Sequence, residues 1–212
     1  MPAATSFPIK MNVPKVVVFD LGKVLVDFDY SIAARKVVAR SSKSPSDLIT
    51  LLATSPLIKQ YESGLVTRQD FFQTIRDTVG FKGDLVEFGG YFADIFTEIP
   101  AMTALHAGLR QRGVPTFILS NTNDLAVEHI ERNFPFFREF DGYIFSYKIG
   151  AMKPDARIYA ALESKCGQTG ADVVYVDDLP ENISAGAARG WRTILHKSPD
   201  RTRAAFEGLG LA

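Results

Sequence analysis

Short, uninterrupted apolar runs recur along this chain. The first, residues 16–19, contains three valines and a phenylalanine and ends directly before Asp20. Runs of this length and composition are typical of strands that are buried on both faces of a parallel sheet. Four further apolar runs span residues 114–119, 142–145, 173–176 and 193–196. We therefore expect five strands in one sheet.

Segments of helical length lie between the later runs. In residues 101–111, Leu105 and Leu109 stand four positions apart, as on one face of a helix, and Gly113 follows as a stop signal. Three further segments show a helical pattern, at 123–133, 155–165 and 181–189. Because strands and helices alternate, the pattern predicts an α/β fold with a parallel sheet and right-handed crossovers.

The interval between residues 28 and 100 interrupts this alternation. It contains no strand pattern, and its apolar spacing predicts four amphipathic helices, at 31–39, 46–53, 68–79 and 84–96. We therefore expect a helical insertion after the first strand. The expected organisation is a flexible N-terminal tail at 1–12, an α/β core at 13–27 and 98–212, and a helical cap at 28–97.

Composition and charge restrict the class of partner. The 212 residues are 46% hydrophobic, and 24 basic side chains balance 24 acidic ones, so there is no electrostatic reason to expect binding to nucleic acid or to an anionic membrane. No apolar run approaches the roughly 18 residues of a membrane span. The single cysteine, Cys166, excludes an internal disulfide and fits a reducing compartment, so we expect a cytoplasmic protein. The sequence leaves the oligomeric state open.

Reactive side chains stand near the carboxyl ends of the predicted strands. Asp20 follows the first strand, Ser120 the second, and the pair Asp177 and Asp178 the fourth, while Lys153 comes shortly after the third. The carboxyl ends of parallel strands meet at one edge of the sheet, where ligands bind in folds of this class. The set provides a nucleophile, a hydroxyl group, a cation and two carboxylates for a hard metal ion. These are the components of a phosphoryl-transfer site.

Four motifs carry these residues, in chain order VVVFDLGKVLVD, FILSNTN, GAMKPDARIY and VVYVDDLPEN. With a helical insertion after the first motif, the chain from Lys15 to about Leu209 resembles the haloacid dehalogenase (HAD)-like superfamily of phosphohydrolases. The Asp-Leu-Gly opening is most similar to a branch that includes sugar phosphatases of the α-glucose-1-phosphatase type. The resemblance implies a Rossmann-like sheet with strand order 5-4-1-2-3, flanked by helices, and an α-helical cap inserted after the first strand.

The resemblance also implies a role for each phosphate-binding residue. Asp20 attacks the phosphoryl group and forms an aspartyl-phosphate, which water then hydrolyses. Ser120 and the backbone N–H of Asn121 bind the phosphate oxygens. Lys153 neutralises the nucleophile and the charge that develops on the phosphate.

Magnesium is the cofactor that the resemblance implies. An oxygen of Asp20, the main-chain carbonyl of Gly22 and the carboxylate of Asp178 would bind the ion together with waters, and Asp177 would lie beside it with contact through a water. A small octahedral ion with few protein ligands fits Mg²⁺ better than Zn²⁺.

Gly22 departs from the pattern of the family's phosphatases. They carry at this place a second Asp that protonates the leaving group, and a placed proton donor typically contributes ~10²–10⁴-fold to the rate. Its absence leaves three alternatives: a substrate with a good leaving group, another proton source, or a weak or inactive catalyst. Asp27, where the first strand meets the insertion, is a candidate compensating acid. Glu62, in a turn between cap helices, is a candidate substrate contact.

These observations predict Mg²⁺-dependent hydrolysis of a small phosphorylated metabolite, such as a sugar phosphate, through an aspartyl-phosphate on Asp20. Two alternatives stay open: a metal-independent 2-haloacid dehalogenase that uses the same Asp20, and a non-catalytic relative that binds phosphate or a metabolite. Asp177 and Asp178 count against dehalogenation, because adjacent carboxylates near Asp20 are costly without a divalent cation.

Overall fold

The structure is a computed structural model that describes residues 13–211, without the side chains of residues 45 and 51–54. The tail expected at 1–12 lies outside the described residues. Among the residues that are described, no helix combines the length and the apolar character needed to cross a membrane.

A five-stranded parallel sheet forms the centre of the molecule. The strands are β1 (Val16–Phe19), β4 (Thr116–Ser120), β5 (Gly142–Phe145), β6 (Val173–Asp177) and β7 (Arg192–Leu195). Their spatial order is β5-β4-β1-β6-β7. Read from β7 to β5, with the five strands numbered 1 to 5 along the chain, this is the predicted order 5-4-1-2-3, so the prediction is confirmed. The central strand β1 pairs with β4 through Val17 and Thr116 and with β6 through Val16 and Val173.

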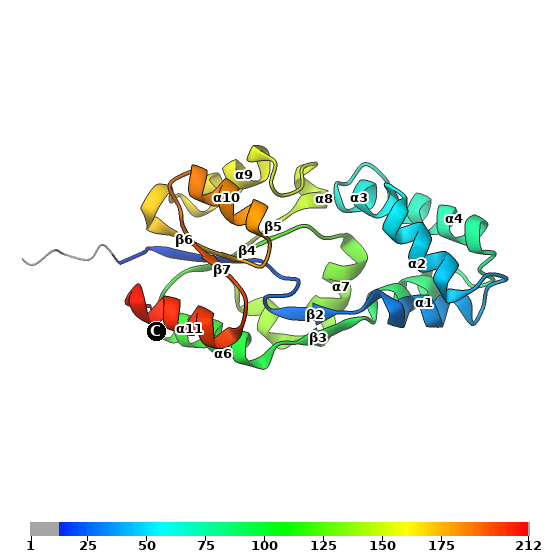
Figure 1. Cartoon of the computed structure of the whole chain (residues 1–212), viewed down its shortest axis with the longest axis horizontal. Helices are drawn as coiled ribbons and strands as arrows, with labels where there is room; N and C mark the ends of the chain where they lie inside the picture. Colours follow the sequence, from blue (N-terminus) through cyan, green and yellow to red (C-terminus); the bar gives the residue numbers. More distant parts are fainter. Residues whose placement is uncertain (1–12, 212) are drawn as a thin grey trace, which may run out of the picture.

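Alternate residues of β1 enter two separate hydrophobic clusters, one on each face of the sheet. Val17 and Phe19 face a cluster that includes residues of α6 (Pro100–Gln111), α7 (Asp124–Asn133) and α11 (Pro199–Gly208). Val16 and Val18 face the other, which includes residues of α9 (Ala156–Cys166) and borders α10 (Pro180–Ala188). Figure 1 shows α9 and α10 above the sheet and α6 and α11 below it. Burial on both faces explains why the strand is apolar at every position.

A second body of helices, which we call the cap helices, extends to the right of the sheet in Figure 1. It has its own hydrophobic cluster, centred on aromatic residues such as Phe71 and Phe88. Helix α4 occupies the predicted residues, because Thr67 caps its first turn and Gly80, in the left-handed conformation, ends it. The cap helices are α1 (Tyr30–Val38), α2 (Pro45–Thr54), α3 (Leu57–Glu62), α4 (Arg68–Val79) and α5 (Leu85–Ala93).

Two short strands connect the sheet to the cap helices. β2 (Val26–Phe28) and β3 (Phe96–Glu98) pair antiparallel, with Phe28 opposite Phe96. The expectation of no strand between residues 28 and 100 was therefore wrong at β3, and the helix expected at 84–96 ends at Ala93 instead. Strands of three residues are too short to show an alternating pattern, and this pair forms only because the two chain segments meet.

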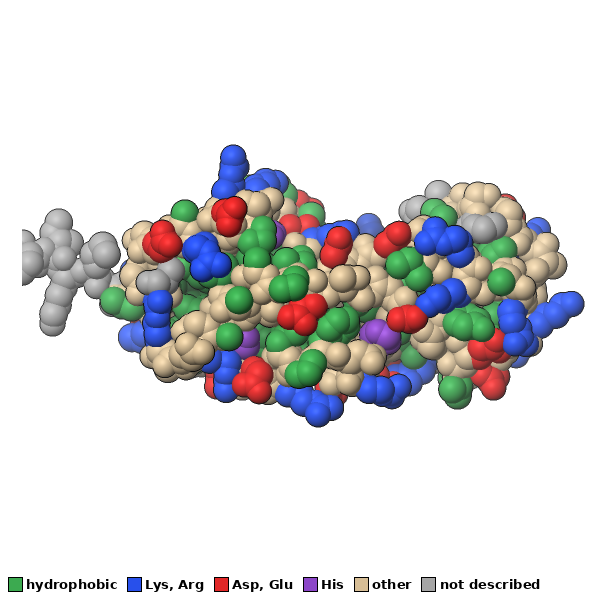
Figure 2. Space-filling model, turned by 90° about the horizontal axis from the view of Figure 1, so that it is seen from below, with side chains coloured by type: hydrophobic (Ala, Val, Ile, Leu, Met, Phe, Trp, Pro, Cys, Tyr) green, Lys and Arg blue, Asp and Glu red, His purple; other side chains and the backbone are tan. Residues whose placement is uncertain are grey.

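The remaining elements are short and lie in the connections. They are the helix α8 (Ser146–Ile149) and the 3₁₀ turns η1 (Pro135–Glu139) and η2 (Gly170–Asp172). On the face shown in Figure 2, basic and acidic side chains are interspersed rather than gathered by sign.

Candidate active site

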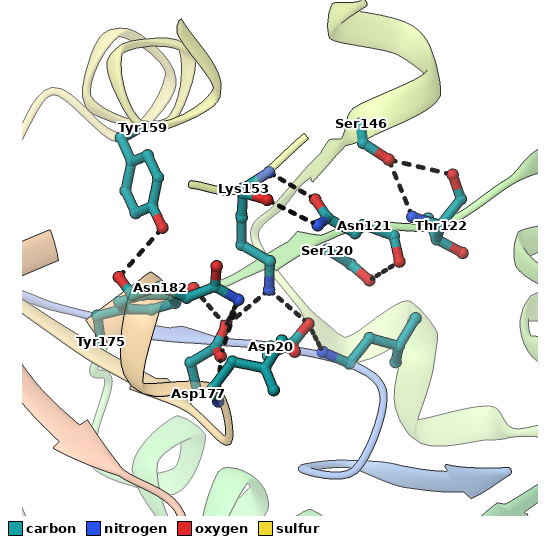
Figure 3. Close-up of polar contacts among 12 residues, drawn as sticks. Asp20, Ser120, Asn121, Thr122, Ser146, Lys153, Tyr159, Tyr175, Asp177 and Asn182 are labelled. Atoms are coloured by element: carbon teal, nitrogen blue, oxygen red, sulfur yellow. Dashed lines mark hydrogen bonds and ion pairs between the residues drawn. The ribbon is translucent and has the colours of Figure 1, made fainter. Parts of the chain in front are cut away.

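The parallel sheet brings Asp20 and Asp177 to one edge, because Asp20 follows β1 and Asp177 ends the adjacent β6. The backbone N–H of Asp20 donates to the carbonyl of Val176 at 2.8 Å, which extends the β1–β6 ladder to Asp20. The ammonium group of Lys153 lies between the two carboxylates (Figure 3). Its Nζ is 2.8 Å from Oδ1 of Asp20 and 2.7 Å from Oδ2 of Asp177. The predicted nucleophile and the predicted cation are therefore in direct contact.

All three of these side chains are buried, and their pKa values depend on both burial and the neighbouring charges. It raises the pKa of Asp20 from 3.8 to about 7, with the charge of Lys153 opposing and that of Asp177 adding to the shift. Burial alone would lower the pKa of Lys153, but the charges of Asp20 and Asp177 raise it above its ordinary value. Burial acts to raise the pKa of Asp177, and the charge and hydrogen bond of Lys153 lower it overall. Lys153 is therefore a cation that stabilises ionised carboxylates on both sides.

Asp178 adds a third carboxylate to this edge of the sheet. One oxygen each from Asp20, Asp177 and Asp178 lie within 4.8 Å of one another. Burial, and next the charge of Asp177, raise the pKa of Asp178. Three carboxylates thus face one ammonium group, and carboxylate oxygens are the ligands that hard divalent cations prefer. The donor set fits a magnesium ion.

Asp177 is held in place by side chains around it. The hydroxyl group of Tyr175 donates to Oδ2 of Asp177, and Nδ2 of Asn182 donates to both carboxylate oxygens at 3.0 and 3.2 Å. The backbone N–H of Leu179 donates to Oδ1 at 2.8 Å. With both oxygens engaged, Asp177 anchors Lys153. Asp178, by contrast, makes no hydrogen bond to another side chain in the part of the chain that the structure describes.

The sequence analysis did not select Tyr175, although a signal was present. Tyr175 stands two residues before Asp177 in β6, and residues at this spacing share one face of a strand. A tyrosine on the same face as a strand-end carboxylate could have been proposed as its hydrogen-bond donor.

Ser120 and Asn121 end β4, beside β1. The Ser120 side chain is buried, and its hydroxyl group makes one long hydrogen bond, 3.4 Å, to the carbonyl of Asn121. The Asn121 side chain pairs with the backbone of Lys153: Nδ2 donates to the Lys153 carbonyl at 3.1 Å, and the Lys153 N–H donates to Oδ1 at 2.7 Å. The sequence predicted only a backbone role for Asn121. Its amide also fixes the loop that carries Lys153, 32 residues further along the chain.

Gly22 and Asp27 lie where the chain passes from the sheet to β2. Gly22 forms an isolated backbone bridge with Val26. The Asp27 side chain is 59% exposed and ion-paired with Lys23. The hydrogen bond from Lys23, and next that from the Phe28 N–H, lower the pKa of Asp27. The structure therefore does not bring Asp27 into the Asp20 cluster, and an exposed, ionised carboxylate is a poor proton donor.

Glu62 is the last residue of α3 and not a turn residue as expected, and its backbone contacts the core. The hydroxyl group of Ser146 donates to the Glu62 carbonyl at 2.5 Å and accepts from the Thr122 N–H at 2.9 Å, so the cap contacts the end of β4 close to Ser120. Burial raises the pKa of the Glu62 carboxyl to about 7, with Lys59 opposing. Burial, and next the charge of Glu62, raise the pKa of Tyr30, which places Glu62 near the first residue of α1.

Gly64 makes the closest approach between the turn after α3 and the core. Its φ is +71°, and a Cβ atom there would lie 2.3 Å from the backbone oxygen of Tyr147. A side chain at this position would therefore collide with main-chain atoms of α8.

A family comparison decides the class of protein. The family model described as haloacid dehalogenase-like hydrolase matches residues 14–190. The chain belongs to this family of hydrolases. The region matched contains the Asp20, Ser120, Lys153 and Asp177 motifs.

Two individual proteins are similar to this chain at about a quarter sequence identity. The sesquiterpene phosphatase astK of Aspergillus oryzae is 26% identical over 184 residues, which cover 83% of this chain and 86% of that protein. Acyl-CoA dehydrogenase family member 10 of Mus musculus is 25% identical over 205 residues, and the chain spans 19% of the length of that protein.

Solved structures share the fold. A HAD family enzyme of Bacteroides thetaiotaomicron has a TM-score of 0.77 at 23% identity, covering 87% of this chain and 94% of its own. The same enzyme is known in complex with magnesium and inorganic phosphate, with a TM-score of 0.76. The L-2-haloacid dehalogenase of Xanthobacter autotrophicus has a TM-score of 0.63 at 18% identity, covering 94% of this chain and 84% of its own.

Proposed function

We propose that this protein is a phosphomonoesterase that forms an aspartyl-phosphate on Asp20. The observation that carries the proposal is the contact of Lys153 with both Asp20 and Asp177, at 2.8 and 2.7 Å. An ammonium group in this place favours the ionised form of Asp20, the form that attacks, against the effect of burial, and it stabilises negative charge on an entering phosphate. The A. oryzae relative is named a phosphatase, and the B. thetaiotaomicron enzyme has been solved with phosphate, which supports the same reading.

The reaction has two steps. In the first, an Asp20 carboxylate oxygen bonds to phosphorus as the bond from phosphorus to the ester oxygen breaks, and the alkoxide takes a proton from solvent. In the second, water bonds to phosphorus and the bond to Asp20 breaks. Inorganic phosphate and a proton leave, and the Asp20 carboxylate is regenerated. The two steps together convert an ester and one water into an alcohol and phosphate.

The phosphate would lie against groups at the ends of β4 and β6. Ser120 offers a hydroxyl group whose one hydrogen bond is long, 3.4 Å, and the Asn121 backbone N–H is a second donor. Lys153 supplies a positive charge. The side-chain amide of Asn121 helps to position it, because that amide binds the backbone N–H and carbonyl of Lys153. These groups hold the three phosphate oxygens and orient phosphorus toward Asp20.

We propose Mg²⁺ as the cofactor, held by Asp20, Asp178 and the Gly22 carbonyl. Asp177 would act beside it, because hydrogen bonds already engage both of its oxygens. When bound, the ion supplies positive charge that offsets the carboxylates and the phosphate. The B. thetaiotaomicron enzyme in its magnesium complex supports this choice.

The division of the chain is part of the proposal. The core comprises 13–27 and 98–212, and the cap comprises 28–97, whose Glu62 would contact the alcohol part of the substrate. Two kinds of alcohol are candidates. The Asp-Leu-Gly opening indicates sugar phosphates, and the name of the A. oryzae relative indicates an apolar terpenoid ester.

Phosphate release from acetyl phosphate and p-nitrophenyl phosphate tests the proposal. We expect turnover with Mg²⁺, loss of turnover with EDTA, and recovery when Mg²⁺ is added in excess. Asp20→Asn is expected to reduce turnover by about 10³-fold or more. Asp77→Asn, on the exposed surface of α4, is the matched control and keeps the wild-type rate.

The alternatives predict different results in the same assay. Turnover that persists in EDTA or in Asp20→Asn contradicts the proposal. Halide release from a 2-haloacid without metal would support the dehalogenase. Phosphate binding without turnover of either substrate would support the non-catalytic relative.

A further inference from the structure

Phe28 fills the space beside Gly22. An ideal Cβ atom built on Gly22 would lie 2.9 Å from Cε1 of the Phe28 ring and 3.5 Å from Cδ1. A Cβ atom essentially never comes within 3.0 Å of a heavy atom outside its own residue and its two chain neighbours. The ring therefore occupies the volume into which any side chain at position 22 would project.

The ring is fixed in this position by its surroundings. It packs edge-to-face against Tyr30 and Phe96, with ring centroids 5.5 and 6.1 Å apart. The ammonium group of Lys23 lies 4.6 Å from the ring centroid and donates to the Phe28 carbonyl at 3.1 Å. Phe28 lies in β2, paired with β3, and is partly exposed. The ring is therefore held in position and is partly open to solvent.

A row of packed aromatic rings continues from β2 into the cap. Tyr30 packs against Phe92 with centroids 6.1 Å apart, and Phe92 belongs to the cap's buried cluster. Because Phe92 is buried, the partly exposed ring of Phe28 is the part of this row that a substrate group extending from Asp20 toward the cap would meet. Position 22 is two residues after Asp20, so this row begins close to the reacting atoms.

We propose that Phe28 is a specificity-determining residue that selects phosphate esters of apolar alcohols. The inference rests on the proposed function and names its substrate class. Next to the ester oxygen, the ring offers dispersion and hydrophobic contact and no hydrogen-bond acceptor for hydroxyl groups. A polyhydroxylated alcohol on this surface loses hydrogen bonds to water without replacing them. Apolar alcohols lose none.

A pair of six-carbon esters tests the inference: n-hexyl phosphate and sorbitol 6-phosphate, which are both esters of primary alcohols and differ in hydroxylation. In the wild type we expect kcat/KM to favour the hexyl ester by about 10-fold or more. Phe28→Ala is expected to reduce this ratio to within about threefold of unity, and Phe28→Leu to keep part of it. Phe136→Ala removes a partly buried phenylalanine elsewhere and keeps the wild-type ratio.

The outcomes separate this inference from the proposed function. Absence of wild-type turnover on p-nitrophenyl phosphate contradicts the proposed function itself. Turnover on p-nitrophenyl phosphate without a preference for the hexyl ester overturns only the role of Phe28, and so does a preference that Phe28→Ala and Phe28→Leu leave unchanged. If Phe28 had only a structural role, its substitution would lower kcat/KM for both esters by the same factor, and the ratio of the two values would not change.

A second measurement checks the position of the ring without using activity. Gly22→Ala adds the Cβ atom that Phe28 would contact, so we expect it to lower the melting temperature in the wild type and to lower it less in the Phe28→Ala background. Equal losses in both backgrounds would show that the ring is not beside Gly22 and would overturn the inference.

Discussion

The hydroxyl group of Tyr61, in cap helix α3, donates a hydrogen bond to the carboxylate of Asp124, at the start of core helix α7. Arg68 joins the same contact, with Nε 2.9 Å from Oδ2 of Asp124 and Nη2 2.6 Å from Oε1 of Glu128. Cap and core are thus connected by a small network that is separate from the Asp20 cluster.

Arg68→Gln should loosen this connection. The ion pairs of Arg68 with Asp124 and Glu128 are partly exposed, so we expect the free energy that holds the cap against the core to fall by about 1 kcal/mol. This corresponds to roughly fivefold faster hydrogen exchange of the amides in residues 63–67. Arg76→Gln, on the same helix, is the control because its ion pair, with Asp77, lies within α4. Unchanged exchange in Arg68→Gln would show that the network does not hold the cap.

Asn121→Ala should slow catalysis without preventing metal binding. The substitution leaves the Lys153 N–H and carbonyl without their amide partners, so the ammonium group loses its fixed position. We expect kcat to fall by about 10- to 100-fold, equivalent to roughly 1.4–2.7 kcal/mol. Asn133→Ala removes an exposed amide on α7 and should leave kcat unchanged. If Asn121→Ala keeps full activity, the pairing of Asn121 with Lys153 is not needed to position the cation.

Asp178→Asn should abolish stabilisation by magnesium. A ligand that binds only the folded state at 100 times its Kd stabilises it by about 2.7 kcal/mol, so the wild-type melting temperature should rise with Mg²⁺. Asp178→Asn removes a carboxylate that has no other hydrogen-bond partner among the described side chains, and its melting temperature should not respond to Mg²⁺. Asp141→Asn is the control. An equal response in Asp178→Asn would place the ion elsewhere.

His106 should make the fold sensitive to acid. The side chain is 1% exposed and stacks on Phe140 with ring centroids 3.8 Å apart. Burial, with Arg110 adding to the shift, lowers its pKa from 6.5 to about 4. Between these pH values the unfolded chain binds the proton and the folded chain does not, so stability falls as pH falls from 6.5 toward 4. A shift of this size is worth up to about 3 kcal/mol.

Denaturant titrations at several pH values measure this contribution. Between pH 6.5 and 4, the unfolding free energy of His106→Gln should fall by less than that of the wild type, because glutamine does not titrate. Parallel losses in the two proteins would show that His106 does not carry the effect.

The meeting of Asp20 with Asp177 was predictable because it follows from sheet geometry. Each ends an apolar run that forms a parallel strand, and one crossover rule brings both to the same edge. Helix α4 was predictable for a different reason. Its end signals, Thr67 and Gly80, are local, and nothing distant is needed to read them.

The features that sequence did not predict depend on distant partners. Strands β2 and β3 have three residues each and are defined by their pairing across the whole cap. The amide of Asn121 pairs with Lys153 far along the chain, and no local pattern encodes that contact. The same holds for Phe28 and Gly22. The sequence shows a glycine at position 22, where the family's phosphatases carry Asp, but only the structure shows that the Phe28 ring occupies the space beside it.

The glycine at position 64 has a consequence for how the two bodies can move. Its backbone is seated against the oxygen of Tyr147 so closely that even a methyl group would hold the surfaces apart. The absence of a side chain at Gly64 thus sets how closely the cap approaches α8. Across related chains, replacement of this residue should therefore accompany a wider or differently shaped entrance, with the chemistry at Asp20 left as it is.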